Sequence, residues 1–197
     1  MDFNTKRTMF VVRNVLFMKS QNTILPTLLD YAILGLLQSQ NMSGYRIRKM
    51  FEETALGSYS SSPGTIYPAL NRLQKMELVA KVKQDETGKF QFQLSSKGLD
   101  VLISWLKKPL EKANVEKNNN ELFLRFAFMD NLVEKKDKMI FLESFRILQT
   151  DYVKTLKLYL KKNGNSMPLH GKLAFEHGLE SNKTTLKWCK NTLIKIT

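Results

Sequence analysis

The chain has 197 residues, of which 43% are apolar and 25% are charged, so it is long enough to bury a core and has the composition of a soluble globular protein. Lysine and arginine number 31 against 18 aspartates and glutamates, a net charge of +13, which favours a polyanionic partner, either nucleic acid or an anionic membrane surface. A single cysteine, Cys189, excludes an internal disulfide and a cysteine-based metal site and fits a reducing, cytoplasmic location. No apolar run reaches the ~18 residues of a membrane span, so we expect no membrane partner.

Residues 1–23 are predicted to be an N-terminal extension, helical or flexible. They have a basic start and several apolar residues, but Arg13 and Asn14 interrupt the apolar run. No small-residue cleavage site follows, so a signal peptide is not expected. Met18 precedes the first strongly patterned segment. The sequence leaves open whether residues 1–17 belong to the native protein.

Three helices are predicted next, at residues 25–39, 44–54 and 63–76. The first is apolar on much of its surface, and Ser43 can cap the second. In the third, one face at ~100° per residue is apolar. That face consists of Ile66, Ala69, Leu70, Leu73 and Met76.

A hairpin and a fourth helix complete this half of the chain. Residues 79–84 and 89–94 alternate apolar with polar side chains around a glycine-containing loop, which is typical of a β-hairpin. Ser95 can cap a helix over 96–110. Three helices, a hairpin and a helix are the order of a winged helix-turn-helix over residues 24–110. The fold class is thus mainly α with a small β wing, and an unrelated α+β module of the same order is the alternative.

The remaining chain is predicted to be a polar linker over 111–120 and a helical domain over 121–197. Residues 112–120 are rich in asparagine and lysine. Beyond them, apolar residues from Phe141 to Tyr159 follow steps of three and four, a sustained helical seam close to coiled-coil spacing.

The segments "LDYAILGLL", "SGYRIRKMF", "SPGTIYPALNRLQKMELV" and "FQLSSKG" resemble the PadR family of transcriptional regulators over about residues 24–106. The helical 120–195 is similar to the C-terminal domain of that family. The resemblance implies a winged helix that binds operator DNA as a homodimer, usually as a repressor, with C-terminal helices supplying much of the dimer contact. The expected dimer residues are Leu102, Leu106, Phe141, Phe145, Leu148, Tyr152, Leu186 and Leu193. The chain departs from the pattern at its wing, where Phe92 replaces a tyrosine, Ser95 replaces a threonine and arginines are missing.

The residues expected to bind double-stranded DNA lie around the third helix. Opposite its apolar face stands the row Gly64, Pro68, Asn71 and Lys75. Asn and Arg can make bidentate base contacts, whereas hydroxyls, lysines and helix N-termini suit phosphates. The other expected DNA-binding residues are Tyr45, Arg46, Lys49, Ser60, Ser61, Ser62, Thr65, Tyr67, Arg72, Lys81, Lys83 and Lys89, with Arg72 assigned to bases.

Nothing in the sequence points to an enzyme, a metal or a cofactor. The only histidines are His170 and His177, without carboxylates at ligand spacing, and no phosphate-binding or nucleophile motif occurs. An effector pocket for a small aromatic or hydrophobic molecule is a further expectation, with an ordinary aromatic core as its alternative. Its residues would be Trp105, Phe123, Phe126 and Trp188. The alternative to DNA binding is a winged-helix protein-interaction module.

Overall fold

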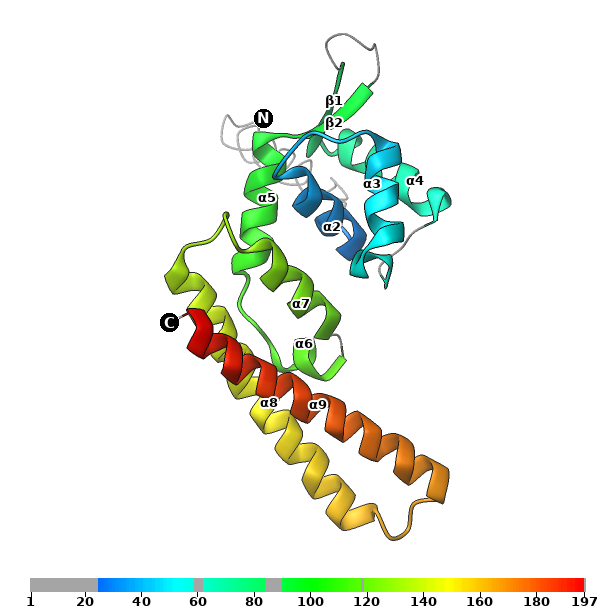
Figure 1. Ribbon diagram of the computed structural model, residues 1–197, viewed down its shortest axis with the longest axis vertical. Helices are drawn as coiled ribbons and strands as arrows, with labels where there is room; N and C mark the ends of the chain where they lie inside the picture. The colour runs from blue at the N-terminus through cyan, green and yellow to red at the C-terminus, as the bar shows by residue number, and fades with distance from the viewer. Residues whose placement is uncertain (1–24, 59–61, 84–89, 118, 197) are drawn as a thin grey trace, which may run out of the picture.

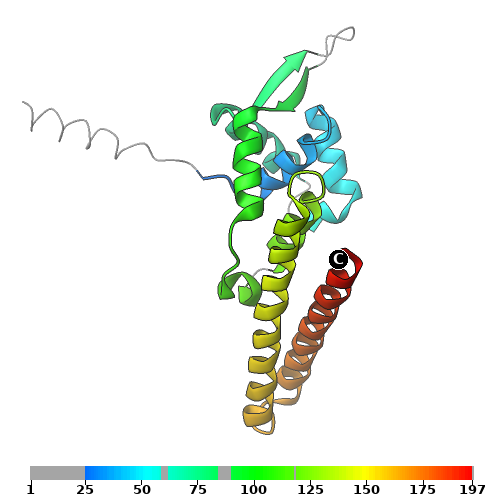
Figure 2. The same ribbon diagram turned by 90° about the vertical axis from the view of Figure 1, so that its left-hand side faces the viewer.

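The computed structural model describes residues 25–58, 62–83, 90–117 and 119–196, so the predicted extension at 1–23 lies outside the described residues. Two parts follow each other along the long axis of the molecule (Figure 1). A group of short helices carries a hairpin at one end, and a pair of long helices extends from it toward the other end (Figure 2). Within the described residues, no helix is long and apolar enough to cross a membrane.

The first part has the predicted order of elements. They are α2 (Leu28–Leu37), α3 (Gly44–Glu53), the short 3-10 helix η1 (Ala55–Ser58), α4 (Pro63–Lys75), β1 (Val79–Lys83), β2 (Phe90–Leu94) and α5 (Ser96–Lys107). This order and arrangement confirm the fold class, mainly helical with a small hairpin wing.

Side-chain caps set where the helices of this part begin. The Ser43 hydroxyl accepts a hydrogen bond from the Arg46 N–H at 3.2 Å, and the Ser95 hydroxyl accepts one from the Gly98 N–H at 2.9 Å. Both predicted caps are thereby confirmed. Thr27 and Asp30 form a reciprocal capping box at α2, in which each side chain accepts from the backbone N–H of the other. The helix therefore begins at Leu28 and is shorter than predicted.

The predicted apolar face of α4 packs inward. Ile66, Leu70 and Leu73 are fully buried, as is Ala69. They contact α2 and α3, so α4 is held along one side and presents the other to solvent.

A backbone bridge ties the wing to the start of α3. Strand β1 pairs antiparallel with β2, so that Val79 lies opposite Leu94 and Lys83 lies opposite Phe90. In addition, the backbone of Met42, in the turn before α3, exchanges two hydrogen bonds with Phe92 of β2 at 3.1 and 2.8 Å. This bridge fixes the wing relative to the start of α3.

The second part consists of α6 (Lys112–Lys117), α7 (Asn119–Phe128), α8 (Lys135–Asn163) and α9 (Leu169–Ile196). The interpretation of 112–120 as a linker is wrong in its structural sense, since 112–117 is helical and Val115 is buried. One buried apolar side chain is enough to hold such a short helix against its neighbours. Because the segment is otherwise polar, its composition does not indicate a docked helix. Helix α6 contacts α7 and α8.

The helical seam is present, but it faces the interior of the chain itself. Phe141 and Phe145 of α8 are buried, and Leu148 and Tyr152 are half-buried beside them. Leu102 and Leu106 of α5 have no exposed surface at all. Phe141, Phe145, Leu102 and Leu106 are therefore corrected from dimer contacts to core residues, because a side chain already covered within one chain has almost no surface left for a partner. Leu148 and Tyr152 keep part of their surface. Leu186 and Leu193 of α9 are half-buried, and Leu193 packs against the same core.

Helix α7 joins the two parts. The ring of Phe128 lies against Gly35 of α2, where a Cβ would stand 2.4 Å from the ring. Arg125 is buried, and its guanidinium lies over the ring of Phe141 at 5.0 Å. It donates to the carbonyl of Leu106, at 2.9 Å, and to that of Lys108, so α7 caps the C-terminal end of α5.

Candidate nucleic-acid interface

Helix α4 begins with a motif that looks like a helix breaker. Ser62 is the N-cap, and its hydroxyl accepts from the Gly64 N–H at 3.2 Å. Pro63 occupies the first turn, where a proline's missing N–H costs nothing. Pro68 lies inside the helix on the exposed side. Among the residues that the structure describes, the one atom within 4 Å of a Cβ built on Gly64 is the Ser62 Oγ, at 3.4 Å.

The predicted outward row is exposed as expected. Gly64, Pro68, Asn71 and Lys75 all lie on the solvent side of α4. Thr65 is exposed as well, and its hydroxyl donates to the Ser62 carbonyl at 2.9 Å. The row therefore presents the amide of Asn71 and the ammonium group of Lys75 toward its C-terminal end. At its start, Gly64 leaves the helix backbone without a side chain.

Tyr67 stands beside this row and keeps 44% of its surface exposed. Its ring lies across the first residue of α3, since a Cβ on Gly44 would be 2.7 Å from the tyrosine Cε1. The ring is thus braced on one side, while nearly half of the residue remains in solvent.

The structure gives Arg72 a different role from the predicted base contact. Its guanidinium pairs in bidentate fashion with the carboxylate of Asp30, with Nη2 2.6 Å from Oδ1 and Nε 3.0 Å from Oδ2. The Asp30 side chain is fully buried, whereas 31% of the Arg72 side chain is exposed. Because a buried carboxylate needs such a partner, Arg72 is corrected from a base-reading residue to a tie between α4 and α2. Its partner was missed in the sequence, although the Thr-x-x-Asp spacing at 27–30 marks a capping box.

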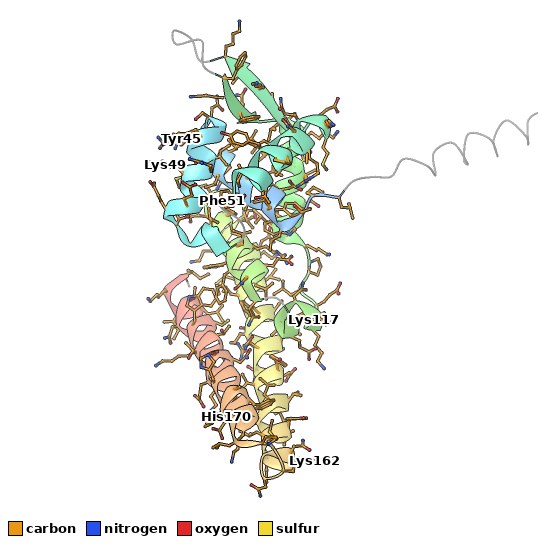
Figure 3. All side chains as sticks on the ribbon, turned by 90° about the vertical axis from the view of Figure 1, so that its right-hand side faces the viewer. Tyr45, Lys49, Phe51, Lys117, Lys162 and His170 are labelled. Atoms are coloured by element: carbon orange, nitrogen blue, oxygen red, sulfur yellow. The ribbon has the colours of Figure 1, made fainter. Side chains whose placement is uncertain are left out.

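Helix α3 presents a second polar surface. Tyr45 and Lys49 project from α3 in Figure 3, and Tyr45 and Arg46 are exposed. Lys49 pairs with Glu53 at 3.4 Å, and this exposed pair leaves the lysine available to a stronger anion.

The wing carries an exposed cation and an exposed ring. Lys81 Nζ lies 4.4 Å from the centroid of the Phe90 ring, and Lys83 is exposed at the strand end. Three predicted contacts, Lys89, Ser60 and Ser61, lie outside the described residues.

The four predicted effector residues do not form one site. Phe123 and Phe126 of α7 meet Trp188 of α9 edge-on at 5.0 and 5.4 Å between ring centroids. Trp105 instead stacks on Tyr31 of α2, with centroids 4.3 Å apart and planes at 4°. The first three thus belong to an aromatic core, and Trp105 belongs to a separate surface.

That surface is an open groove of about 1290 Å³ where the two parts meet. It is lined by Tyr31, Trp105, the C-terminal end of α4 at Met76, and Glu121 of α7. Burial raises the pKa of Tyr31, and the carboxylates of Glu121 and Asp30 raise it further. Burial lowers the pKa of Arg125, whose guanidinium lies 6.0 Å from the Trp105 ring, to about 10.

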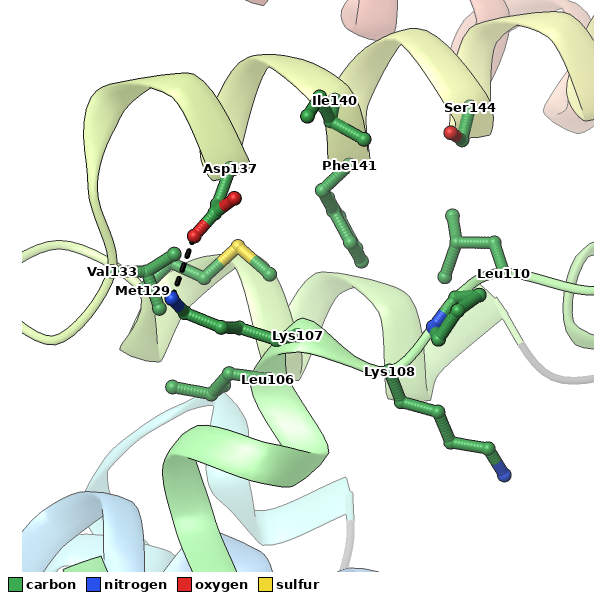
Figure 4. Close-up of a pocket in the computed structure, with 11 residues that line it drawn as sticks. Leu106, Lys107, Lys108, Leu110, Met129, Val133, Asp137, Ile140, Phe141 and Ser144 are labelled. Atoms are coloured by element: carbon green, nitrogen blue, oxygen red, sulfur yellow. Dashed lines mark ion pairs between the residues drawn. The ribbon is translucent and has the colours of Figure 1, made fainter. Parts of the chain in front are cut away.

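A second, much smaller cavity of about 70 Å³ separates the end of α5 from α8 (Figure 4). Phe141 and Met129 line it, and an ion pair between Lys107 Nζ and Asp137 Oδ2 spans it at 2.7 Å. This pair raises the pKa of Lys107. A space of this size holds a few waters rather than an effector.

Within the described ranges, no three His, Cys, Asp or Glu side chains come together as a metal-ligand set. Cys189 is fully buried, and burial raises the pKa of its thiol to about 12, which is the opposite of an activated nucleophile.

Comparison with known proteins agrees with this arrangement. Residues 33–102 match the family described as "Transcriptional regulator PadR-like family". The transcriptional regulator YqjI of Escherichia coli (strain K12) is 33% identical over 87 residues, 44% of this chain and 40% of that protein. The match thus spans well under half the length of that relative.

Two further comparisons extend over most of the chain. The negative transcriptional regulator PadR of Bacillus subtilis (strain 168) is 25% identical over 178 residues, 85% of this chain and 97% of that protein. A crystal structure of Bacillus subtilis PadR in complex with operator DNA aligns over 87% of this chain and 100% of its own, with 24% identity and a TM-score of 0.39. These relatives are named as regulators of transcription. Residues 33–102 of this chain thus match the PadR-like family of transcriptional regulators.

Proposed function

We propose that this chain binds operator DNA as a homodimer and represses transcription, with α4 in the major groove. The observation that carries the proposal is the two-sided character of α4. One side is fully buried, and the other presents Gly64, Pro68, Asn71 and Lys75 to solvent. A recognition helix needs this arrangement, and two-fold symmetry predicts a palindromic or pseudopalindromic operator.

The residues of the exposed row are expected to make different kinds of contact with DNA. Asn71 has the amide that pairs with adenine in the major groove, and Lys75 suits a phosphate or a guanine. Gly64 and Pro68 leave little side chain between the helix backbone and the DNA. The Ser62 hydroxyl, Tyr45, Arg46 and Lys49 supply contacts to the phosphates, together with Lys81 and Lys83 of the wing.

The test is fluorescence anisotropy on a DNA fragment obtained by selection of bound genomic fragments. Asn71→Ala is expected to weaken binding about tenfold, as the loss of one bidentate base contact does. Gly64→Leu is expected to abolish binding while the fold is retained, since no described residue lies closer than 3.4 Å to a Cβ at this position. Asn165→Ala and Gly171→Leu, both exposed in the second part, are the matched controls. Unchanged affinity in both α4 variants would refute the assignment.

Salt dependence separates this function from a protein-interaction module. Binding through phosphates loses affinity steeply with salt. Lys75→Ala is expected to lower the slope of log Kd against log salt by about one, and the exposed Lys117→Ala is expected to leave it unchanged. Weak binding that salt does not alter would favour the protein-interaction module instead.

We assign DNA binding to residues 24–110 and dimerisation to residues 121–197. The surface for a second copy is the outer side of α8, away from α9. Ile140, Ile147 and Leu158 lie there 54%, 48% and 59% exposed. Their spacing of 7 and 11 residues places them on one stripe of the helix. Antiparallel pairing of two copies of α8 brings Ile140 of each copy toward Leu158 of the other, which closes a two-fold interface.

Light scattering after size exclusion tests the dimer surface. Ile147→Glu places a charge at the middle of the stripe and is expected to convert the dimer to monomer. Asn165→Glu, in the exposed loop after α8, is expected to remain dimeric. A dimeric Ile147→Glu variant would exclude this stripe, and a monomeric wild-type protein at micromolar concentration would exclude the homodimer.

A small aromatic or hydrophobic effector is a second component of the proposal, and the groove beside Trp105 and Tyr31 supports it. The groove touches Met76 at the end of α4 and Glu121 of α7, so an occupant contacts both the DNA-binding helix and the helical part. The chain has two tryptophans, Trp105 and Trp188. In a Trp188→Phe variant, Trp105 alone reports binding by its fluorescence, and the Trp105→Phe variant is the control that must stay silent. A response only in the Trp105→Phe variant would move the effector to the aromatic core.

A further inference from the structure

Three elements of the DNA-binding part meet around Gly44. This residue is the first of α3, directly after its cap Ser43. A Cβ built here would stand 2.7 Å from Cε1 of Tyr67, 3.5 Å from Cδ1 of Leu70 and 3.5 Å from Cε2 of Phe92. Gly44 thus lies between α4 and the wing strand β2, in a space that only a hydrogen fills.

The tightest of these three contacts is the one to Tyr67, which contacts DNA in the proposed function. The other two neighbours, Leu70 and Phe92, are buried, and their distances are ordinary van der Waals contacts. Tyr67 is different, because its ring lies on Gly44 while 44% of its surface is exposed. A side chain at position 44 therefore displaces the tyrosine outward, into solvent, and leaves the core in place.

The backbone at this point is also fixed. Ser43 caps α3 through the Arg46 N–H, and Met42 is bridged to Phe92 by two backbone hydrogen bonds. Gly44 has helical backbone geometry that alanine adopts without strain. The start of α3 therefore cannot move away from a new Cβ, so Tyr67 must.

We propose that Gly44 is a positioning residue for DNA binding, which acts by holding the ring of Tyr67 in the orientation that contacts the DNA backbone. The inference rests on the proposed function. In this proposal, the Tyr67 hydroxyl donates a hydrogen bond to a phosphate oxygen of the bound duplex. Gly44 itself contributes no contact to DNA.

A double-mutant cycle tests the proposal on the full chain. Gly44→Ala is expected to weaken operator binding about tenfold, as much as Tyr67→Ala does, since each loses one hydrogen bond to a charged group. In the Tyr67→Ala background, Gly44→Ala is expected to change Kd by less than about twofold, because the residue acts only through the ring. Gly171→Ala is the matched control, since nothing lies within 4 Å of its Cβ.

Folding is measured on the same variants. The unfolding temperature of Gly44→Ala is expected to equal or exceed that of the wild type, because alanine is the better helix former. Loss of affinity without loss of stability is a result that a purely structural glycine does not give. An NMR cross-peak between the Gly44 Hα and the Tyr67 ring protons, present in the wild type without DNA, tests the contact independently.

The outcomes separate this inference from the proposed function. Wild-type affinity in Gly44→Ala, or an equal loss in both backgrounds of the cycle, overturns the positioning role while DNA binding stands. Absence of the cross-peak overturns it too. A wild-type protein that binds no DNA overturns the proposed function and the positioning role with it.

Discussion

The two parts of the molecule are held together by different kinds of contact. From α2 to α5, polar side chains join elements that are far apart in the sequence, as Arg72 does with Asp30 across 42 positions. In the α8–α9 pair, Arg146 pairs with Glu143 and Lys183 pairs with Glu180, each within one turn of its own helix. An apolar seam holds these two helices instead, with Gln149 and its bonds to Asn182 as the polar exception.

This difference predicts where a single polar substitution lowers the stability of the fold. Breaking a pair that joins two elements leaves a buried group without its partner, whereas breaking an exposed pair within one helix leaves both groups in water. Substitutions in the first part should therefore be costly at a few polar positions. Those in the second part should be costly only along the apolar seam.

The largest expected effect is that of Arg72→Ala. The variant leaves the fully buried carboxylate of Asp30 unpaired. This loss is expected to lower the free energy of unfolding by about 2 to 3 kcal/mol. The value lies at the lower end for buried pairs because Arg72 is partly exposed. The matched control is Arg146→Ala in α8, whose pair lies within one helix with both side chains partly in water, so its loss is expected to cost little. Urea denaturation measures both, and similar losses would refute the contrast.

Gly35→Ala is expected to have the next largest effect, at the junction of the two parts. Its Cβ would stand 2.4 Å from the Phe128 ring, and such overpacking costs about 1 to 2 kcal/mol. Gly178→Ala in α9, where nothing lies within 4 Å of the Cβ, is expected to be neutral or stabilising. Calorimetry shows whether weakened docking of α7 splits unfolding into two transitions. A single transition at the wild-type temperature would mean that α7 does not couple the parts.

The elements of the first part were predictable because each has a local signal. Ser43 and Ser95 mark helix starts, and the alternation in the two strands marks the hairpin. The burial of Ile66 and Leu70 follows from helical spacing alone. Helix α6 was not predictable, because its docking depends on one buried residue, Val115, in an otherwise polar stretch.

The candidate site was predictable in its exposed row and not in its long-range contacts. Spacing places Asn71 and Lys75 opposite the core, but it does not reveal that Arg72 is drawn to Asp30. The same periodicity marks Phe141 as apolar without saying whether the chain or a second copy covers it. Gly44 gives no signal in a single sequence, since its importance is the closeness of Tyr67 across the fold.

Ser95→Ala is expected to cost about 1 kcal/mol, the usual loss for an N-cap. The Ser95 hydroxyl accepts from the Gly98 N–H and donates to the Glu77 carbonyl at 2.7 Å, so it joins the turn between α4 and β1 to α5. The matched control is Ser181→Ala in α9, whose hydroxyl donates to the His177 carbonyl in its own helix. That variant is expected to change the free energy of unfolding by a few tenths of a kcal/mol. An equal cost in the two variants would weaken the distinction between the parts.

The smallest expected effect is on the reactivity of Cys189, whose thiol reports directly on the second part. Burial raises the pKa of Cys189 from its ordinary 9.0 to about 12, so the folded chain holds this proton more tightly than the unfolded chain. The resulting contribution to stability is complete below pH 9 and is lost as pH rises toward 12. Because the thiol is fully buried, a thiol reagent at pH 8 is expected to modify it only through opening of the α8–α9 pair. If Gly35→Ala loosens the junction alone, the modification rate stays at the wild-type value. A faster modification of Cys189 in the Gly35→Ala variant would show that the long helices depend on the first part for their packing. The two regions would then form one cooperative unit.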